Sequence, residues 1–74
     1  MKITIKLFAT LRKNNLKEQQ IDIPENAHVA DIIPLLNIRQ EEVSIIMVNG
    51  RIKKLAHVLK PGDIVALFPL VGGG

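Results

Sequence analysis

Apolar and polar residues alternate at the start of the chain. Over residues 3–7 every second side chain is aliphatic, and the same period recurs over residues 19–23. A period of two predicts a strand with one buried face in each segment. Residues 9–13 can form one helical turn before Asn14 and Asn15, which favour a turn. We therefore expect the two strands to form a hairpin with a long loop.

Four aliphatic residues then recur at helical spacing. They lie at i, i+3, i+4 and i+7: Val29, Ile32, Ile33 and Leu36. This spacing predicts the main helix, with one apolar face. Asn26 or His28 can cap it, and Asp31 suits its positive end. Pro34 lies too deep for the first turn and is expected to kink or shorten the helix.

The second half of the chain predicts strands and turns. Residues 43–48 form a β-rich apolar run, Asn49-Gly50 is a strong turn signal, and Ile52 begins a short strand. Pro and Gly within 60–63 occupy the places that a type II turn requires. The last strand is expected from residue 64 to about residue 70.

The order of these elements predicts the fold class. Strand, strand, helix, strand, short strand, strand is satisfied by an α+β domain: a β-grasp, or ubiquitin-like, roll with a mixed sheet of four to five strands and one main helix on one face. The 74 residues suffice for one domain only. We expect it to span residues 1–71, followed by a flexible glycine tail over residues 72–74.

The composition limits the kind of core, the cellular location and the classes of binding site that we expect. Only two residues are aromatic, so the core must be aliphatic, and the absence of cysteine excludes disulfides and cysteine-based metal sites. We expect a cytoplasmic protein without a membrane segment, because no apolar run approaches about 20 residues. The net charge of +3 comes from scattered basic residues mixed with acids. This distribution does not favour nucleic-acid binding.

A self-contained active site is not predicted. The sequence has no HExxH motif, phosphate-binding glycine loop or cysteine nucleophile. Neither His28 nor His57 has a second ligand at the spacing of a metal site, so capping or exposure to solvent is the better interpretation. Glu41 and Glu42 are adjacent and point apart, as in a solvated loop. We expect no bound metal or cofactor and no catalysis by the isolated chain.

The sequence finishes with Gly72, Gly73 and Gly74. Glycines without Cβ atoms form a thin tail that can enter a narrow channel and present the carboxylate of Gly74. A frayed terminus or a truncated linker explains the same composition. Both interpretations stay open at this point.

The aromatic residues predict an exposed surface. Phe8 is in phase with the polar positions of the first strand, and Phe68 is out of phase with Val65 and Leu67. Both rings are then expected to face outward, where Met47 and Ile52 can join them in an apolar interaction patch. The alternative is that the two rings close one end of a small core.

Three segments carry a family resemblance. Leu7–Arg12 (LFATLR), Val48–Gly50 (VNG) and Pro61–Gly74 (PGDIVALFPLVGGG) resemble the MoaD branch of the MoaD/ThiS sulfur-carrier family. The similarity covers essentially the whole chain. Leu70 replaces the second proline of the family's ending, and endings in Val-Gly-Gly-Gly are similar to those of some ThiS carriers. The opening segment favours MoaD.

The resemblance implies a two-stage reaction. An adenylating MoeB/ThiF-like enzyme uses ATP to activate Gly74, and a sulfur donor converts the acyl-adenylate into a thiocarboxylate. The loaded tail then enters a MoaE-like large subunit, where its sulfur becomes part of molybdopterin. Gly72 and Gly73 would serve passage of the tail, and Phe8, Ile52 and Phe68 would dock the partners.

Two other functions fit the same resemblance. A ThiS-like carrier would deliver sulfur to the thiazole of thiamine, to tRNA or to an amino-acid precursor. A ubiquitin-like modifier would instead be joined through Gly74 to lysines of other proteins.

Overall fold

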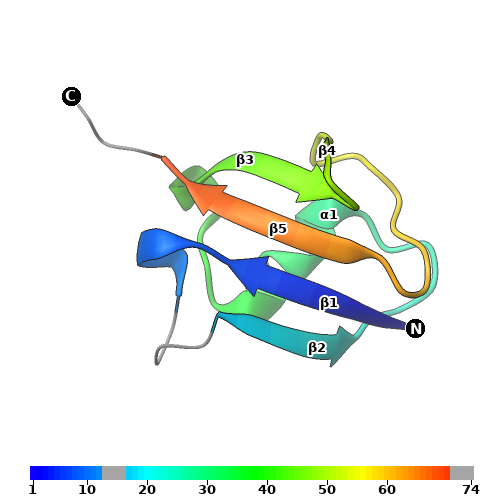
Figure 1. Ribbon diagram of the computed structural model, residues 1–74. Coiled ribbons are helices and arrows are strands. Elements are labelled where there is room, and N and C mark those ends of the chain that lie inside the picture. Colours follow the sequence, from blue (N-terminus) through cyan, green and yellow to red (C-terminus); the bar gives the residue numbers. More distant parts are fainter. Residues whose placement is uncertain (13–16, 71–74) are drawn as a thin grey trace.

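The computed structural model describes residues 1–12 and 17–70 (Figure 1). The strands are β1 (Lys2–Leu7), β2 (Glu18–Asp22), β3 (Val43–Val48), β4 (Arg51–Ile52) and β5 (Ile64–Pro69). The helical segments are η1 (Ala9–Leu11), α1 (Val29–Ile32), η2 (Pro34–Leu36) and η3 (Gln40–Glu42), of which only α1 is an α-helix and the others are 3₁₀ turns. The predicted order of elements is confirmed.

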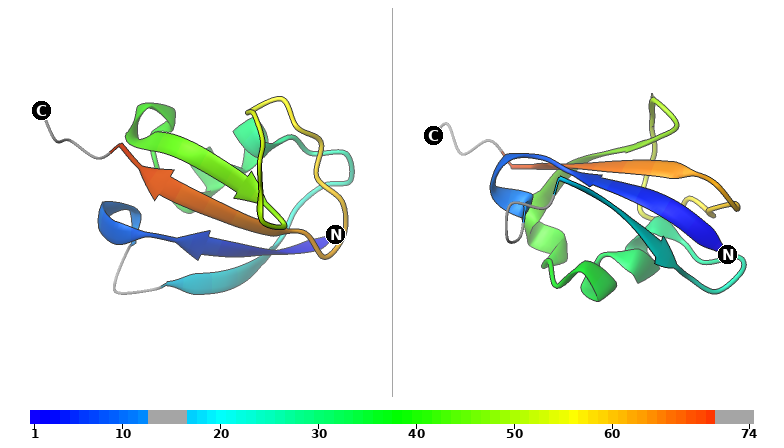
Figure 2. Two further views of the ribbon diagram at one scale, coloured as in Figure 1. Left: turned by 45° about the horizontal axis from the view of Figure 1, so that its top comes forward. Right: turned by 60° about the horizontal axis from the view of Figure 1, so that its bottom comes forward.

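The five strands form one mixed sheet in the order β2-β1-β5-β3-β4. β1 pairs parallel to β5 at the centre, and the remaining neighbours are antiparallel. The right-hand view of Figure 2 shows the helical segments on one face of this sheet, so the opposite face is left uncovered by helices. This is the β-grasp, ubiquitin-like fold that the sequence predicts.

The core lies between the sheet and the helical segments and is built from aliphatic side chains. The most completely buried residues come from both layers: Ile3, Ile5, Leu7, Leu11, Val29, Ile32, Ile33, Leu59, Val65 and Leu67. β1, β3 and β5 contribute alternate residues, as the period-two pattern requires. Complete burial of one such side chain contributes about 1.5–3 kcal/mol. The four residues predicted for the apolar helix face are all buried.

The helix is shorter than a full amphipathic helix because of Pro34. α1 ends at Ile32, Ile33 keeps helical backbone angles, and the chain continues as the 3₁₀ turn η2 from Pro34. A proline inside a helix removes one backbone donor and its ring clashes with the preceding turn. The predicted shortening is therefore confirmed, and Asn37 ends the segment with a left-handed φ of 61°.

His28, and not Asn26, caps α1. The backbone N–H of His28 donates to Oδ2 of Asp31 at 2.8 Å, and the ring Nδ1 lies 3.3 Å from the same oxygen. This hydrogen bond from the backbone, followed by the one from the ring, lowers the pKa of the Asp31 carboxyl. Asn26 instead adopts a left-handed backbone, with φ of 65°.

Both predicted turns are present. Asn49 and Gly50 have φ values of 53° and 82°, as a two-residue β-hairpin between β3 and β4 requires. Gly62 has φ of 82°, and the N–H of Asp63 donates to the carbonyl of Lys60 at 3.1 Å. This is the type II turn expected before β5.

A polar contact joins these two turns, and sequence analysis did not predict it. Asn49 Nδ2 donates to Asp63 Oδ1 at 2.8 Å, and Asn49 Oδ1 accepts the N–H of Ile64 at 2.9 Å. The other carboxylate oxygen of Asp63 accepts the N–H of Lys60 at 2.8 Å. Asp63 is the one buried charged residue in the described part of the chain, and each of its carboxylate oxygens has a partner.

Candidate functional site

The face of the sheet away from the helical segments carries the aromatic pair. Leu7 and Leu67 are opposite each other in the β1–β5 register and point into the core, so Phe8 and Phe68 turn to the outer face. Both aromatic residues are half-buried, and their rings stack with centroids 4.3 Å apart and 13° between their planes. The predicted strand phase is confirmed, because neither ring belongs to the core.

Three aliphatic residues extend this surface across the next strands. Ile45 is paired with Phe68, and Met47 is paired with both Ala66 and Ile52. Ile45 is 45% exposed and Ile52 is 73% exposed. We define the outer apolar patch as Phe8, Ile45, Met47, Ile52 and Phe68. The outward positions predicted for Met47 and Ile52 are confirmed, whereas Ile45 was not predicted.

The other half of the outer face is polar. β1 and β2 present the alternating residues Lys2, Thr4, Lys6, Glu18, Gln20 and Asp22. Lys6 and Glu18 form a loose ion pair, with Nζ and Oε1 3.9 Å apart. Because this pair is exposed, its contribution to stability is small. The polar half therefore borders the outer apolar patch along β1.

Arg12 lies beside the aromatic pair, and the sequence analysis gave it no role. Its Nε donates to the carbonyl of Leu7 at 2.9 Å, and its guanidinium carbon lies 6.0 Å from the centre of the Phe8 ring. This distance is at the outer limit of a cation–π interaction. Arg12 therefore connects η1 to the end of β1 and flanks Phe8 with a positive charge.

The C-terminal end of β5 lies at the same end of the sheet as the aromatic pair. β5 ends at Pro69, and the N–H of the following Leu70 donates to the carbonyl of Glu42 at 3.2 Å. Leu70 is 68% exposed. The predicted tail residues Gly72, Gly73 and Gly74 lie outside the described residues. The last described residue, Leu70, therefore lies at the end of the sheet that carries Phe8 and Phe68.

The described residues contain no other arrangement typical of an active site. No group of three His, Asp or Glu side chains suited to a metal ion occurs in residues 1–12 and 17–70. Across the same ranges, no helix combines the length and the apolar character that a membrane span needs. His28 serves as a helix cap, and Glu42 accepts the backbone N–H of Arg39 at 3.0 Å. The expected capping role of His28 is confirmed, whereas Glu41 and Glu42 lie in the 3₁₀ turn η3 and not in a loop.

Comparison with protein families establishes the family of this chain. The sequence model of the ThiS family matches residues 5–74, which is nearly the whole chain. The chain belongs to the ThiS family. This assignment places it among the small ubiquitin-like sulfur-carrier proteins and confirms the MoaD/ThiS resemblance. A search of curated proteins gives no significant match.

Solved structures agree with the ThiS-family assignment. A protein from Pyrococcus furiosus, assigned as molybdopterin converting factor subunit 1, is 33% identical, with a TM-score of 0.76 over 95% of this chain and 98% of that one. SAMP1 from Haloferax volcanii is 25% identical, with a TM-score of 0.80 over the whole of both chains. Urm1 from Trypanosoma brucei, at 18% identity and a TM-score of 0.71 over 99% of this chain and 95% of that one, supports the fold alone.

Proposed function

We propose that this ThiS-family protein is a cytoplasmic sulfur carrier that works as the small subunit of molybdopterin synthase. Its working group is the carboxylate of Gly74. The observation that carries the proposal is the family match, which includes Gly74. The last strand, β5, ends beside the aromatic pair. The relative from Pyrococcus furiosus, assigned as molybdopterin converting factor subunit 1, supports the choice of pathway.

The chemistry begins with activation of the carboxylate. An oxygen of Gly74 attacks the α-phosphorus of ATP on a MoeB/ThiF-like enzyme, and pyrophosphate leaves. A carboxylate is a poor electrophile, but the resulting acyl-adenylate has a phosphate leaving group. A sulfide-equivalent nucleophile attacks the carbonyl carbon, the C–S bond forms, the C–O bond to phosphate breaks, and AMP leaves. The product is a C-terminal thiocarboxylate.

Delivery then requires a partner that supplies the catalytic groups. In this proposal the thiocarboxylate enters a MoaE-like large subunit, where its sulfur forms a bond to carbon of the molybdopterin precursor and displaces an oxygen substituent. Water then cleaves the acyl C–S bond, which leaves the sulfur on the precursor and regenerates the carboxylate of Gly74. Gly72 and Gly73 fit a narrow channel because they lack side chains. The outer apolar patch, with Phe8, Ile52 and Phe68, supplies the docking area beside the end of β5.

Reconstitution tests the proposal. The chain is incubated with its adenylating enzyme, ATP and sulfide, and then with a MoaE-like subunit and the molybdopterin precursor. We expect the mass change of one oxygen replaced by sulfur, located at Gly74 by fragmentation, followed by formation of molybdopterin. Formation of the thiocarboxylate without molybdopterin would refute the pathway and leave the carrier chemistry intact.

Two alternatives share the activated carboxylate. The family match by itself also suits a carrier that delivers sulfur for the synthesis of the thiamine thiazole, for tRNA thiolation or for amino-acid synthesis. The similarity to SAMP1, a small archaeal modifier protein, favours conjugation to other proteins. Transfer of sulfur to a thiazole synthase would identify the first alternative, and isopeptides between Gly74 and lysines in cell extracts would identify the second.

A further inference from the structure

A hollow with a basic rim lies at the end of the sheet opposite the aromatic pair. It has a volume of about 420 Å³ and lies among the β3–β4 turn, the segment after β4 and the turn before β5. Its basic side chains are Arg51, Lys53, His57 and Lys60, and Asp63 also contributes to its lining. None of these residues belongs to the outer apolar patch.

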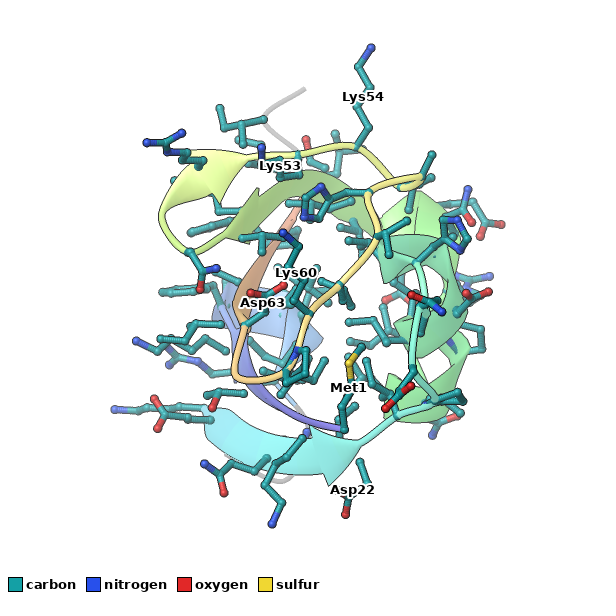
Figure 3. The ribbon with its side chains drawn as sticks, turned by 90° about the vertical axis from the view of Figure 1, so that its right-hand side faces the viewer. Met1, Asp22, Lys53, Lys54, Lys60 and Asp63 are labelled. Carbon is teal, nitrogen blue, oxygen red and sulfur yellow. The ribbon has the colours of Figure 1, made fainter. Side chains whose placement is uncertain are left out.

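The backbone around the hollow is held by hydrogen bonds. The N–H of Lys53 donates to the carbonyl of Ile46 at 2.9 Å, and the carbonyl of His57 accepts the N–H of Val29 at 3.0 Å. The N–H of Lys60 donates to the carboxylate of Asp63. Figure 3 shows Lys60 above Asp63, whereas Lys54 points away from the body of the molecule. The basic side chains are thus presented from a fixed frame.

The positive charge of the hollow is not neutralised within the described ranges. The ion pairs there involve other residues, so Arg51, Lys53 and Lys60 have no carboxylate partner. The one acid in the lining, Asp63, is 8% exposed and its two oxygens accept hydrogen bonds from Asn49 and the N–H of Lys60. The hollow therefore carries three basic side chains without an ion-pair partner and one carboxylate whose two oxygens already accept hydrogen bonds.

The shape and the side chains favour a compact anion. A hollow of this volume is better suited to binding a small molecule than to docking the flat surface of another protein. Lysine ammonium groups and an arginine guanidinium are the usual partners of phosphate oxygens. Both phenylalanines of the chain stack together at the other end of the sheet, so no phenyl ring lies here to stack on a nucleic-acid base.

We propose that this hollow binds a short polyphosphate chain through Arg51, Lys53 and Lys60. The chain of phosphates is either inorganic polyphosphate or the triphosphate of a nucleotide, and the recognised chemistry is the same. The site does not depend on the sulfur-carrier function, because it uses neither Gly74 nor the outer apolar patch.

The test is a titration of the ¹⁵N-labelled full-length chain with sodium tripolyphosphate, followed by NMR at low salt. We expect saturable shifts at the amides of Arg51, Lys53 and Lys60. The double variant Lys53→Gln/Lys60→Gln should bind about tenfold more weakly or worse, because it loses two charge-assisted contacts. The control Lys17→Gln/Lys54→Gln removes the same charge outside the hollow and should bind within about twofold of wild type.

A second titration with ATP distinguishes the sources of the phosphate chain. Equal affinities for ATP and tripolyphosphate support recognition of phosphate alone, and tighter ATP binding supports a nucleotide as the natural ligand. Equal weakening in both double variants would overturn the proposal, since it would reflect net charge alone. Shifts at these amides with a hexaglutamate peptide but not with tripolyphosphate would also overturn it, in favour of an acidic segment of a partner protein.

Discussion

The rings of Phe8 and Phe68 stack 4.3 Å apart, although the two residues lie near opposite ends of the sequence. The parallel pairing of β1 with β5 brings them together, because the register places Leu7 opposite Leu67. Phe8 and Phe68 follow these two residues, and both face the outer side of the sheet. Each ring therefore covers the other while leaving part of its surface to solvent. This pair forms one end of the outer apolar patch, beside the C-terminal end of β5.

Replacing Phe68 with alanine should weaken partner binding far more than folding. An outward aromatic ring contributes area to an interface, where hot-spot losses are about 2 kcal/mol or more. Loss of the stack with Phe8 should lower the free energy of unfolding by only about 1 kcal/mol. Urea denaturation and calorimetric titration with the MoaE-like subunit measure the two quantities on the same variant.

Leu67→Ala is the matched control for Phe68→Ala. Leu67 is the neighbour of Phe68 on β5, but it faces the core with 0% exposure. Its truncation should lower the free energy of unfolding by about 2–5 kcal/mol. A large stability loss for Phe68→Ala together with unchanged partner affinity would show that Phe68 acts as a core residue.

Ile52→Ser should also separate binding from folding. Ile52 is 73% exposed at the edge strand β4, so its replacement should change the free energy of unfolding by less than about 0.5 kcal/mol. Affinity for the partner should fall by about 1 kcal/mol or more if Ile52 docks there. Leu35→Ser is the control, because Leu35 is 62% exposed on the helical side. Equal binding by wild type and Ile52→Ser would remove Ile52 from the interface.

Local patterns were sufficient to predict most of this fold. The alternation in β1 and β5 identifies which side chains face the core, and therefore also which way Phe8 and Phe68 point. Pro34 correctly predicts a short α1, because the effect of proline on a helix is local. The Asn49-Gly50 and Pro61-Gly62 pairs predict their turns because positive φ values restrict the residues that fit.

Long-range contacts were not predictable in the same way. Ile45 is the first of four consecutive apolar residues, and the register of β3 shifts between Val43 and Ile45, so alternation does not assign Ile45 to a face. The hydrogen bond between Asn49 and Asp63 depends on two turns that only the sheet brings together. The same is true of the basic hollow, whose residues come from separate turns.

The contact between Asn49 and Asp63 predicts a specific effect of Asn49→Asp. The substitution replaces the donating amide with a carboxylate facing Oδ1 of Asp63, so a hydrogen bond is lost and two like charges are brought together. We expect a loss of about 1–3 kcal/mol in the free energy of unfolding at neutral pH.

Asn26→Asp is the control for this variant. Asn26 also has a left-handed backbone but is exposed, and its side chain makes no hydrogen bond with the described residues. The Asn26→Asp variant should retain the wild-type free energy of unfolding to within about 0.5 kcal/mol. Chemical denaturation of both variants at neutral pH makes the comparison. Equal stabilities at neutral pH would mean that the Asn49–Asp63 contact does not stabilise the fold.

The helix cap predicts how stability depends on pH. The N–H of His28 holds the pKa of Asp31 below its value in the unfolded chain. The native state therefore favours the carboxylate, and this contribution is fully present above the unfolded pKa and is lost as the pH falls through the folded pKa. Asp31→Asn should reduce the loss of stability on acidification. Asp22→Asn, at an exposed position of β2, is the control and should follow the wild-type profile.

The strongest test of function is at Gly74. The buried core ends at Leu67, so deletion of Gly74 or addition of one residue after it should leave the free energy of unfolding unchanged. Sulfur loading should nevertheless be abolished, because deletion moves the reacting carboxylate one residue back, and extension converts that of Gly74 into an amide. The wild-type chain with its adenylating enzyme, ATP and sulfide should gain the mass difference between oxygen and sulfur, and neither altered chain should. Intact-mass measurement also verifies that the extended chain has not been trimmed. If an untrimmed extended chain still supports molybdopterin formation, the Gly74 carboxylate is not the working group and the sulfur-carrier proposal is wrong.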